Sequence, residues 1–249
     1  MPDAAAVTDA FERVLDEHAP RLLLFSSPDN PTSRLIRDDV FFDLLEMAGR
    51  AGCFVVVDFA YRAQCFVDAV PAHFSASPAT HPNLIRLHSN SKWCRGLGRR
   101  LGWIEAAPHV IEAVEVVQQS TALCPDSVHQ HALSAYLDAA LPDGSLEAYM
   151  AETNALYERA ARHTIRCIDE HLGLRRLEPQ GGLYTVMDVE RDGDAFVREV
   201  LPKTGVIFVP GSGFGRSIAS GVRISYGPLV NDLDRIEEGF RRVGAALAG

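Results

Sequence analysis

Residues 53–61 read CFVVVDFAY, and this stretch decides the fold. Residues 53–57 are apolar without interruption and end at Asp58. That pattern is typical of a strand buried on both faces of a parallel sheet. Parallel strands are usually joined by helices, so strands and helices are expected to alternate on either side of it.

Strand and helix patterns alternate over the first 172 residues. Strands are predicted at 21–26, 53–57, 84–88 and 101–105, and helices at 38–51, 108–119, 126–140 and 145–172. This alternation predicts an α/β fold with a mostly parallel sheet.

The pattern changes after Leu172. Strands are predicted at 175–180, 183–188, 205–209 and 221–226, and helices at 193–202 and 231–247. We expect a small α+β domain carried by the long helix. The predicted division is a large domain at 1–155 and a small C-terminal domain at 156–249.

Composition and charge exclude several classes of protein. Of the 249 residues, 47% are hydrophobic and 23% charged, as in a folded chain. The net charge is −9 and no basic run occurs, so nucleic acid and anionic membranes are not expected partners. No apolar stretch approaches the ~20 residues of a transmembrane helix, and no signal-peptide pattern is visible.

The five cysteines include no CxxC pair. This argues against a disulfide framework or a zinc ribbon and favours a cytoplasmic location. His88, His129 and His131 lack useful metal-ligand spacing, so they are read as structural or solvated and no metal is predicted.

Polar clusters follow three of the predicted strands. They are Asp29–Thr32, Asp58–Tyr61 and Ser89–Lys92. Ligands of open α/β sheets bind outside the carboxyl ends of the strands, so these clusters are expected to converge on one crevice. Arg223 is a fourth candidate for a ligand-binding residue, and it lies within the strand predicted at 221–226.

The ordered set of motifs resembles the class I/II aminotransferases, which are pyridoxal-5′-phosphate (PLP) enzymes of fold type I. The resemblance runs from about residue 20 to the C-terminus. It is carried by Asn30-Pro31-Thr32, Asp58-Phe59-Ala60-Tyr61, Ser89-Asn90-Ser91-Lys92 with Gly98, Arg100 and Gly102, Pro179-Gln180-Gly181-Gly182, Pro210-Gly211-Ser212-Gly213-Phe214 and Arg223.

Each motif taken singly also has a structural interpretation. The Asn-Pro-Thr segment is most often a turn, and Asp58 could cap a helix. Tyr61 could pack in the core, Lys92 could be a solvated surface residue, and Arg223 could form a salt bridge. All of these interpretations would have to hold together in the order of the family.

The resemblance implies the roles around the cofactor ring. Lys92 would hold PLP as a Schiff base, and its released amine would act as general acid and base at the substrate Cα. Asp58 would keep the pyridine nitrogen protonated. Asn30 and Tyr61 would hydrogen-bond the 3-hydroxyl oxygen of the ring.

The remaining implied roles concern the phosphate and the substrate. Ser89 and Arg100 would hold the phosphate, and Ser91 is counted with them as cofactor-binding. Arg223 would bind the substrate α-carboxylate bidentately, with Asn30 also at the substrate.

The function implied is transfer of an amino group between an amino acid and a 2-oxo acid. Lyase, decarboxylase or cyclase chemistry with PLP remains an alternative, because the motifs indicate the cofactor but not the fate of the carbanion. A third possibility is that the chain is an inactive fragment, or a partner subunit that lacks half of the cofactor site.

The sequence departs from the family pattern in two places, and the second departure concerns the expected partner. Ser33 stands where the family usually has glycine. The phosphate-binding loop and the ring-stacking aromatic residue of full-length relatives are not found before residue 20, so the chain is expected to correspond to their C-terminal part. We expect a homodimer, or a partner chain that supplies the missing N-terminal part.

Overall fold

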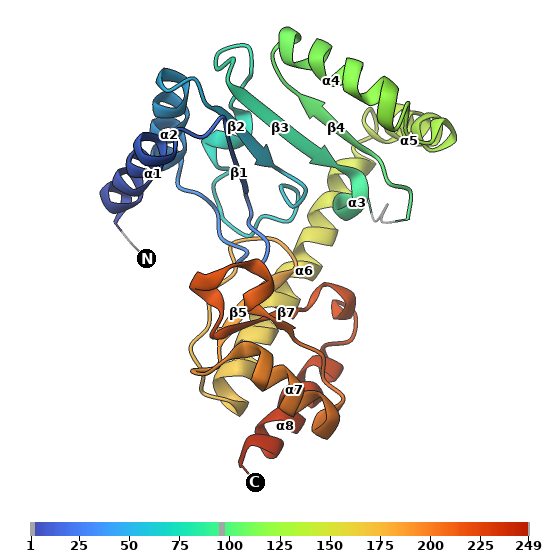
Figure 1. The fold of residues 1–249 in the computed structure, drawn as a ribbon. Helices are drawn as coiled ribbons and strands as arrows, with labels where there is room; N and C mark the ends of the chain where they lie inside the picture. Colours follow the sequence, from blue (N-terminus) through green and yellow to red (C-terminus); the bar gives the residue numbers. More distant parts are fainter. Residues whose placement is uncertain (1–2, 95–97, 249) are drawn as a thin grey trace. The chain divides into compact units, whose positions relative to one another are not determined.

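The computed structural model describes residues 3–94 and 98–248 (Figure 1). The chain divides into two compact units, which are described separately. Unit 1 contains residues up to Ser27, Leu35–Ala63 and Val67–Met150, and unit 2 contains Pro28–Arg34, Gln64–Phe66 and the residues from Ala151 onward. The domain boundary at residue 155 stays a prediction.

The sheet of unit 1 has four strands in the order β1-β2-β3-β4 (Figure 1). The strands are β1 (Leu22–Ser26), β2 (Phe54–Asp58), β3 (Leu84–Ser89) and β4 (Gly102–Glu105). The first three run parallel and β4 is antiparallel to β3, which confirms the predicted α/β class with a mostly parallel sheet. Val55 and Val57 of β2 are fully buried, as expected for an inner strand.

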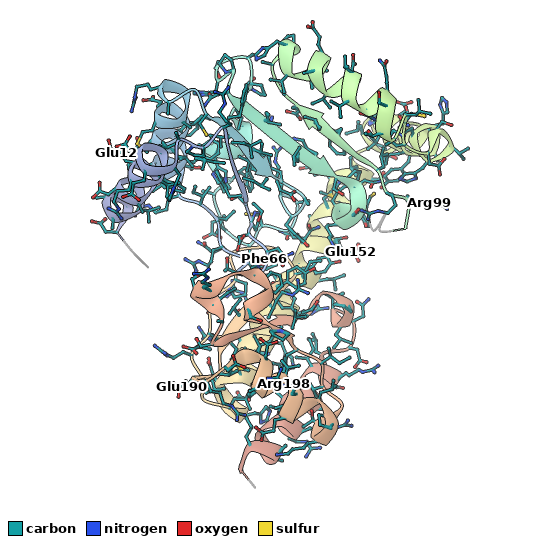
Figure 2. The ribbon with its side chains drawn as sticks, in the orientation of Figure 1. Glu12, Phe66, Arg99, Glu152, Glu190 and Arg198 are labelled. Atoms are coloured by element: carbon teal, nitrogen blue, oxygen red, sulfur yellow. The ribbon has the colours of Figure 1, made fainter. Side chains whose placement is uncertain are left out.

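The described residues of unit 1 also form helices. They are α1 (Ala4–His18), α2 (Asp38–Arg50), α3 (Asn90–Trp93), α4 (Pro108–Thr121) and α5 (Ser127–Ala140). In α2, Phe41, Leu44, Leu45 and Ala48 are buried at the spacing of one helical face. In α1, Leu15 is buried, whereas Glu12 is exposed (Figure 2).

Unit 2 is built on the long helix α6 (Ser145–His171), most of which belongs to it. Its sheet has the order β5-β7-β6, from β5 (Tyr184–Asp188), β6 (Val209–Pro210) and β7 (Gly221–Ser225), and is antiparallel. The helices α7 (Gly193–Thr204) and α8 (Leu233–Ala248) complete the unit. Ile236, Phe240 and Val243 form the buried face of α8.

In the C-terminal part, one predicted strand was wrong and another is shorter than predicted. Residues 175–180 form only an isolated bridge, between Arg176 and Met187. Residues 205–208 are outside the sheet because Gly205, with a φ of 71°, ends α7 in the left-handed conformation. The strand there is limited to Val209–Pro210.

None of the helices within the described ranges combines the length and apolarity needed to cross a membrane.

Candidate functional site

The carboxyl end of β2 presents Asp58. Its Oδ1 accepts a hydrogen bond of 2.8 Å from the N–H of Ala60, which turns the chain sharply after the strand. This turn is followed by Tyr61, whose side chain is buried. The strand end therefore fixes a carboxylate and a phenol within four residues.

The carboxyl end of β3 presents Lys92. Ser89, the last residue of β3, accepts a hydrogen bond of 3.1 Å on its Oγ from the N–H of Ser91 and so starts the short helix α3. Lys92 lies on that helix, and its Nζ is 5.3 Å from the centroid of the Tyr61 ring. The ammonium group over an aromatic face is a cation–π arrangement.

The residues just before β4 lie beside the start of α3. The N–H of Asn90 donates to the carbonyl of Leu101 at 3.2 Å, which places the neighbouring Arg100 near the start of α3. Arg100 is exposed and has a φ of 56°. Gly102 is required there, because a Cβ would lie 2.6 Å from the carbonyl oxygen of His88.

The Asn30 turn belongs to unit 2. Asp29 Oδ2 accepts hydrogen bonds from both the N–H and the hydroxyl of Thr32, at 3.2 and 2.6 Å. Ser33 then takes a φ of 54°, the left-handed region that favours glycine. Its buried Oγ accepts a hydrogen bond of 3.3 Å from the N–H of Tyr184, which links the turn to β5.

Arg223 is held on three sides within unit 2. It lies on β7, the central strand, and its Nη1 donates to Asn30 Oδ1 at 3.0 Å. Its guanidinium carbon is 4.3 Å from the ring centroid of Tyr184 and 4.9 Å from that of Phe214. Its Nε is buried and has no hydrogen-bond partner among the described residues. The guanidinium thus keeps donor capacity for an acceptor that binds there.

The predicted residues fall into two groups. In unit 1 the structure gathers Tyr61 with Lys92 and Ser89 with Ser91, and it puts Asp58 and Arg100 at the ends of neighbouring elements. In unit 2 it brings Asn30 and Arg223 into direct contact. Each group is described within its own unit.

Comparison with known proteins identifies the family. The family model for aminotransferase class I and II matches residues 2–238. The chain belongs to the class I and II aminotransferase family.

Individual relatives agree with this assignment. The chain is 31% identical to the 2-aminoadipate transaminase of Thermus thermophilus, over 97% of this chain and 61% of that protein. It is 25% identical to the aspartate aminotransferase of Musicola paradisiaca, over 91% of this chain and 57% of that protein. This aminotransferase-family chain therefore spans about three fifths of the length of these relatives.

A solved structure shares the fold. The α-aminoadipate aminotransferase of Thermus thermophilus, complexed with N-(5′-phosphopyridoxyl)-L-leucine, matches with a TM-score of 0.85 at 28% identity. The match covers 97% of this chain and 62% of that one. The expected fold type I architecture of the aminotransferases is confirmed.

The structure adds residues that the motifs of the family did not indicate. His129 of α5 was read as structural or solvated, but its Nε2 lies 2.5 Å from Nδ2 of Asn90, next to Lys92. Tyr184 and Phe214 contribute the rings that flank Arg223. No spacing in the sequence links His129 to residue 90, whereas Phe214 lies in the motif at 210–214, which supports the resemblance but gave Phe214 no role.

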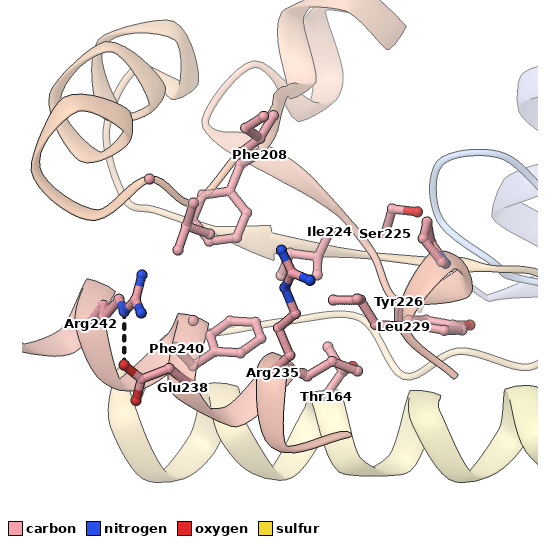
Figure 3. Close-up of a pocket in the computed structure, with 16 residues that line it drawn as sticks. Thr164, Phe208, Ile224, Ser225, Tyr226, Leu229, Arg235, Glu238, Phe240 and Arg242 are labelled. Carbon is pink, nitrogen blue, oxygen red and sulfur yellow. Dashed lines mark hydrogen bonds and ion pairs between the residues drawn. The ribbon is translucent and has the colours of Figure 1, made fainter. Parts of the chain in front are cut away.

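Unit 2 also contains a cavity of about 760 Å³ (Figure 3). It is lined by Phe208, Phe240 and Ile224, with Arg235 of α8 directed into it (Figure 3). Successive residues of a strand point to opposite faces, so Ile224 places this cavity on the face of β7 opposite to Arg223. The cavity is therefore separate from the Asn30–Arg223 group.

Proposed function

We propose that the protein is a PLP-dependent aminotransferase, which transfers an amino group from an amino acid to a 2-oxo acid. The observation that carries this proposal is the placement of Asp58 and Lys92. Asp58 ends β2 and Lys92 follows the end of β3, and the two strands are parallel neighbours with Asp58 in register with Leu87. A carboxylate and an amine therefore extend from the same edge of one sheet.

The chemistry of these side chains fits PLP. Lys92 offers a primary amine for the aldehyde carbon, and the Asp58 carboxylate has a second oxygen, beyond the Oδ1 bound to Ala60, for the pyridinium N–H. The Ser89 hydroxyl accepts from Ser91 and can still donate its own proton to a phosphate oxygen. The buried Nε of Arg223 is a donor suited to a substrate carboxylate.

When bound, PLP supplies an electron sink that stabilises negative charge at the substrate Cα. The Lys92 amine would take the proton from that carbon and would return a proton to the cofactor. The Asp58 carboxylate would hold the proton on the pyridine nitrogen and so keep the ring electron-poor. Tyr61, whose ring lies against the Lys92 ammonium, would donate its hydroxyl proton to the 3-oxygen of the ring.

The remaining side chains orient the two ligands. Ser89, Ser91 and Arg100 hold the phosphate through hydroxyl and guanidinium donors. Arg223 pairs with the substrate α-carboxylate, and Asn30 keeps the guanidinium in place through its Oδ1.

The experiment is an amino-transfer assay on the full chain supplied with PLP. Aspartate and 2-aminoadipate, the substrates named for the relatives, serve as donors with 2-oxoglutarate as acceptor. We expect the oxo acid and glutamate to form in equal amounts, and Lys92→Ala to abolish both. Lys203→Ala is the matched control, because Lys203 is the other lysine and pairs on the surface with Glu199.

Two results would contradict the proposal. Turnover that survives in Lys92→Ala would remove Lys92 from the reaction. Release of carbon dioxide or of an eliminated group without glutamate would indicate decarboxylase or lyase chemistry.

We further propose that the chain forms a homodimer. Val116, Val117 and Val128 of α4 and α5 are 68%, 61% and 75% exposed, and α4 buries no residue within unit 1. Exposed large apolar side chains on a helix that buries no residue in its own unit are a reason to expect a subunit interface there. Light scattering of the unaltered chain should give twice the chain mass. Val117→Glu should shift the measured mass toward that of the monomer, whereas the control Ile207→Glu should leave it unchanged. A monomer for the unaltered chain would contradict this proposal.

A cytoplasmic location remains a prediction from the cysteine content.

A further inference from the structure

Three potential metal ligands meet on the helices of unit 2, away from the proposed PLP residues. His163 and Cys167 lie one turn apart on α6, and Glu237 lies on α8. Nε2 of His163, Sγ of Cys167 and a carboxylate oxygen of Glu237 all lie within 4.8 Å of one another. The proposed amino-transfer mechanism uses none of the three.

The spacing between these atoms matches a tetrahedral zinc site. Zn–S and Zn–N bonds of about 2.3 and 2.0–2.1 Å at a tetrahedral angle put sulfur and nitrogen about 3.5 Å apart. The distance from His163 Nε2 to Cys167 Sγ is 3.5 Å. Glu237 Oε2 is 3.8 Å from His163 Nε2, and its half-exposed side chain can approach further.

The chemistry of the three side chains also suits zinc. Cys167 is buried and Glu237 is about half exposed, so the group reaches from the interior to the surface of the unit. Thiolate, imidazole and carboxylate are the ligands of zinc, and a bound divalent cation would replace the thiol proton.

We propose that His163, Cys167 and Glu237 form a zinc-binding site that joins α6 to α8, with water as the fourth ligand. The Nε2–H of His163 now donates to the carbonyl of Leu233 at 3.1 Å, and Arg166 donates to Nδ1 at 3.1 Å. On binding, the imidazole proton moves to Nδ1 and the exposed Arg166 side chain swings away. Zinc takes Nε2, and the thiol proton passes to solvent.

Cobalt(II) is the probe, because it substitutes for zinc and absorbs when it is bound to a thiolate. The full chain without PLP is titrated with Co²⁺, and Zn²⁺ is then added to displace it. We expect a thiolate-to-cobalt band that saturates at one equivalent. Cys167→Ser should abolish the band, and His163→Gln should weaken binding by more than about tenfold. Cys53→Ser is the matched control, because Cys53 is also buried but lies in unit 1, directly before β2, away from these ligands.

The melting temperature gives a second readout, and circular dichroism shows whether each variant still folds. Zn²⁺ should raise the Tm of the unaltered chain and of Cys53→Ser, but not of Glu237→Gln with His163→Gln, whose circular dichroism should remain native. A cobalt band that persists in Cys167→Ser, or no band in the unaltered chain, would overturn the proposal.

Discussion

Arg223 is a side chain that three neighbours hold in place. Asn30 takes one of its terminal N–H groups, and the rings of Tyr184 and Phe214 flank its guanidinium. Each restraint removes conformational freedom that a substrate would otherwise have to restrict. The buried Nε without a partner among the described residues retains the capacity to pair with a carboxylate.

Replacing Arg223 by lysine should weaken substrate binding. Lysine keeps the charge but cannot form the planar two-point contact, so we expect KM for the amino acid to rise about ten- to hundredfold. Steady-state kinetics with saturating PLP measures this change. Arg235→Lys, on α8 at the separate cavity, should leave KM within about twofold. An unchanged KM for Arg223→Lys would remove Arg223 from substrate binding.

Sequence reasoning at the residue scale was strongest where a motif follows a strand end. Asp58 and Lys92 could be placed because their strands could be predicted. His129 could not, because its contact with Asn90 depends on how α5 folds back over 39 residues. The His163–Cys167 spacing was visible in the sequence, but Glu237 is 70 residues away and only the packing of α8 on α6 brings it close.

At the scale of elements, Gly211 illustrates a close backbone approach. A Cβ at this buried position would lie 1.8 Å from the carbonyl oxygen of Ile218 and 2.7 Å from that of Gly221. Gly213, two residues on in the same 3₁₀ turn, has open space around the corresponding position. The same short turn thus contains one required glycine and one that is sterically unconstrained.

Gly211→Ala should therefore destabilise the protein by about 1–3 kcal/mol, through overpacking against backbone atoms that cannot move easily. Gly213→Ala is the matched control and should change the free energy of unfolding by less than about 0.5 kcal/mol. Urea unfolding monitored by circular dichroism gives both values. Equal effects of the two substitutions would show that the packing around Gly211 is not as described.

The strand predictions at 175–180 and 205–209 had different outcomes. A strand exists only where a neighbouring segment pairs with it, and this limits the second one to Val209–Pro210. Leu177 pairs with Val186 through one backbone hydrogen bond from its N–H, and the ladder does not continue along the segment. The N-terminal part was easier to interpret because Val55, Val56 and Val57 form a continuous apolar run in β2, which is buried in the sheet.

At the scale of the folded unit, His73 links three segments of unit 1. Its Nε2 lies 2.9 Å from Ser27 Oγ at the end of β1, and its Nδ1 lies 2.6 Å from Asp38 Oδ1 at the start of α2. The imidazole is fully buried and stacks on Phe59. Burial lowers the pKa of His73, against the opposing effect of Asp38, while nearby Arg62 lowers it further.

This pKa has a consequence for stability. In the unfolded chain the imidazole takes up a proton below about pH 6.5, whereas in the folded protein it does so only at lower pH. The unfolded state therefore binds the proton first, and the stabilisation from neutral His73 is present above pH 6.5 and lost as pH falls. Burial favours a higher pKa for Asp38, but the N–H groups of His73 and Ala72 outweigh it and leave the pKa lowered, which adds a loss at lower pH.

We expect the free energy of unfolding to fall from pH 6.5 downward, by up to about 1.4 kcal/mol per pH unit from His73. His73→Gln should flatten this slope, although it lowers stability at neutral pH. His18→Gln, at an exposed residue of α1, should leave the slope unchanged. Urea unfolding between pH 5 and pH 7 measures all three proteins. The same slope in His73→Gln would assign the pH dependence to other groups.

The central claim is that Lys92 binds PLP, and one labelling experiment tests it most directly. The full chain is incubated with PLP, reduced with borohydride, digested and mapped by mass spectrometry. Because Lys203 is the other lysine, the map has an internal comparison. We predict a visible absorption band before reduction and a pyridoxyl group on Lys92 afterwards, with Lys203 unlabelled. No band, or label divided between Lys203 and the N-terminus, would contradict the assignment of Lys92 to the cofactor.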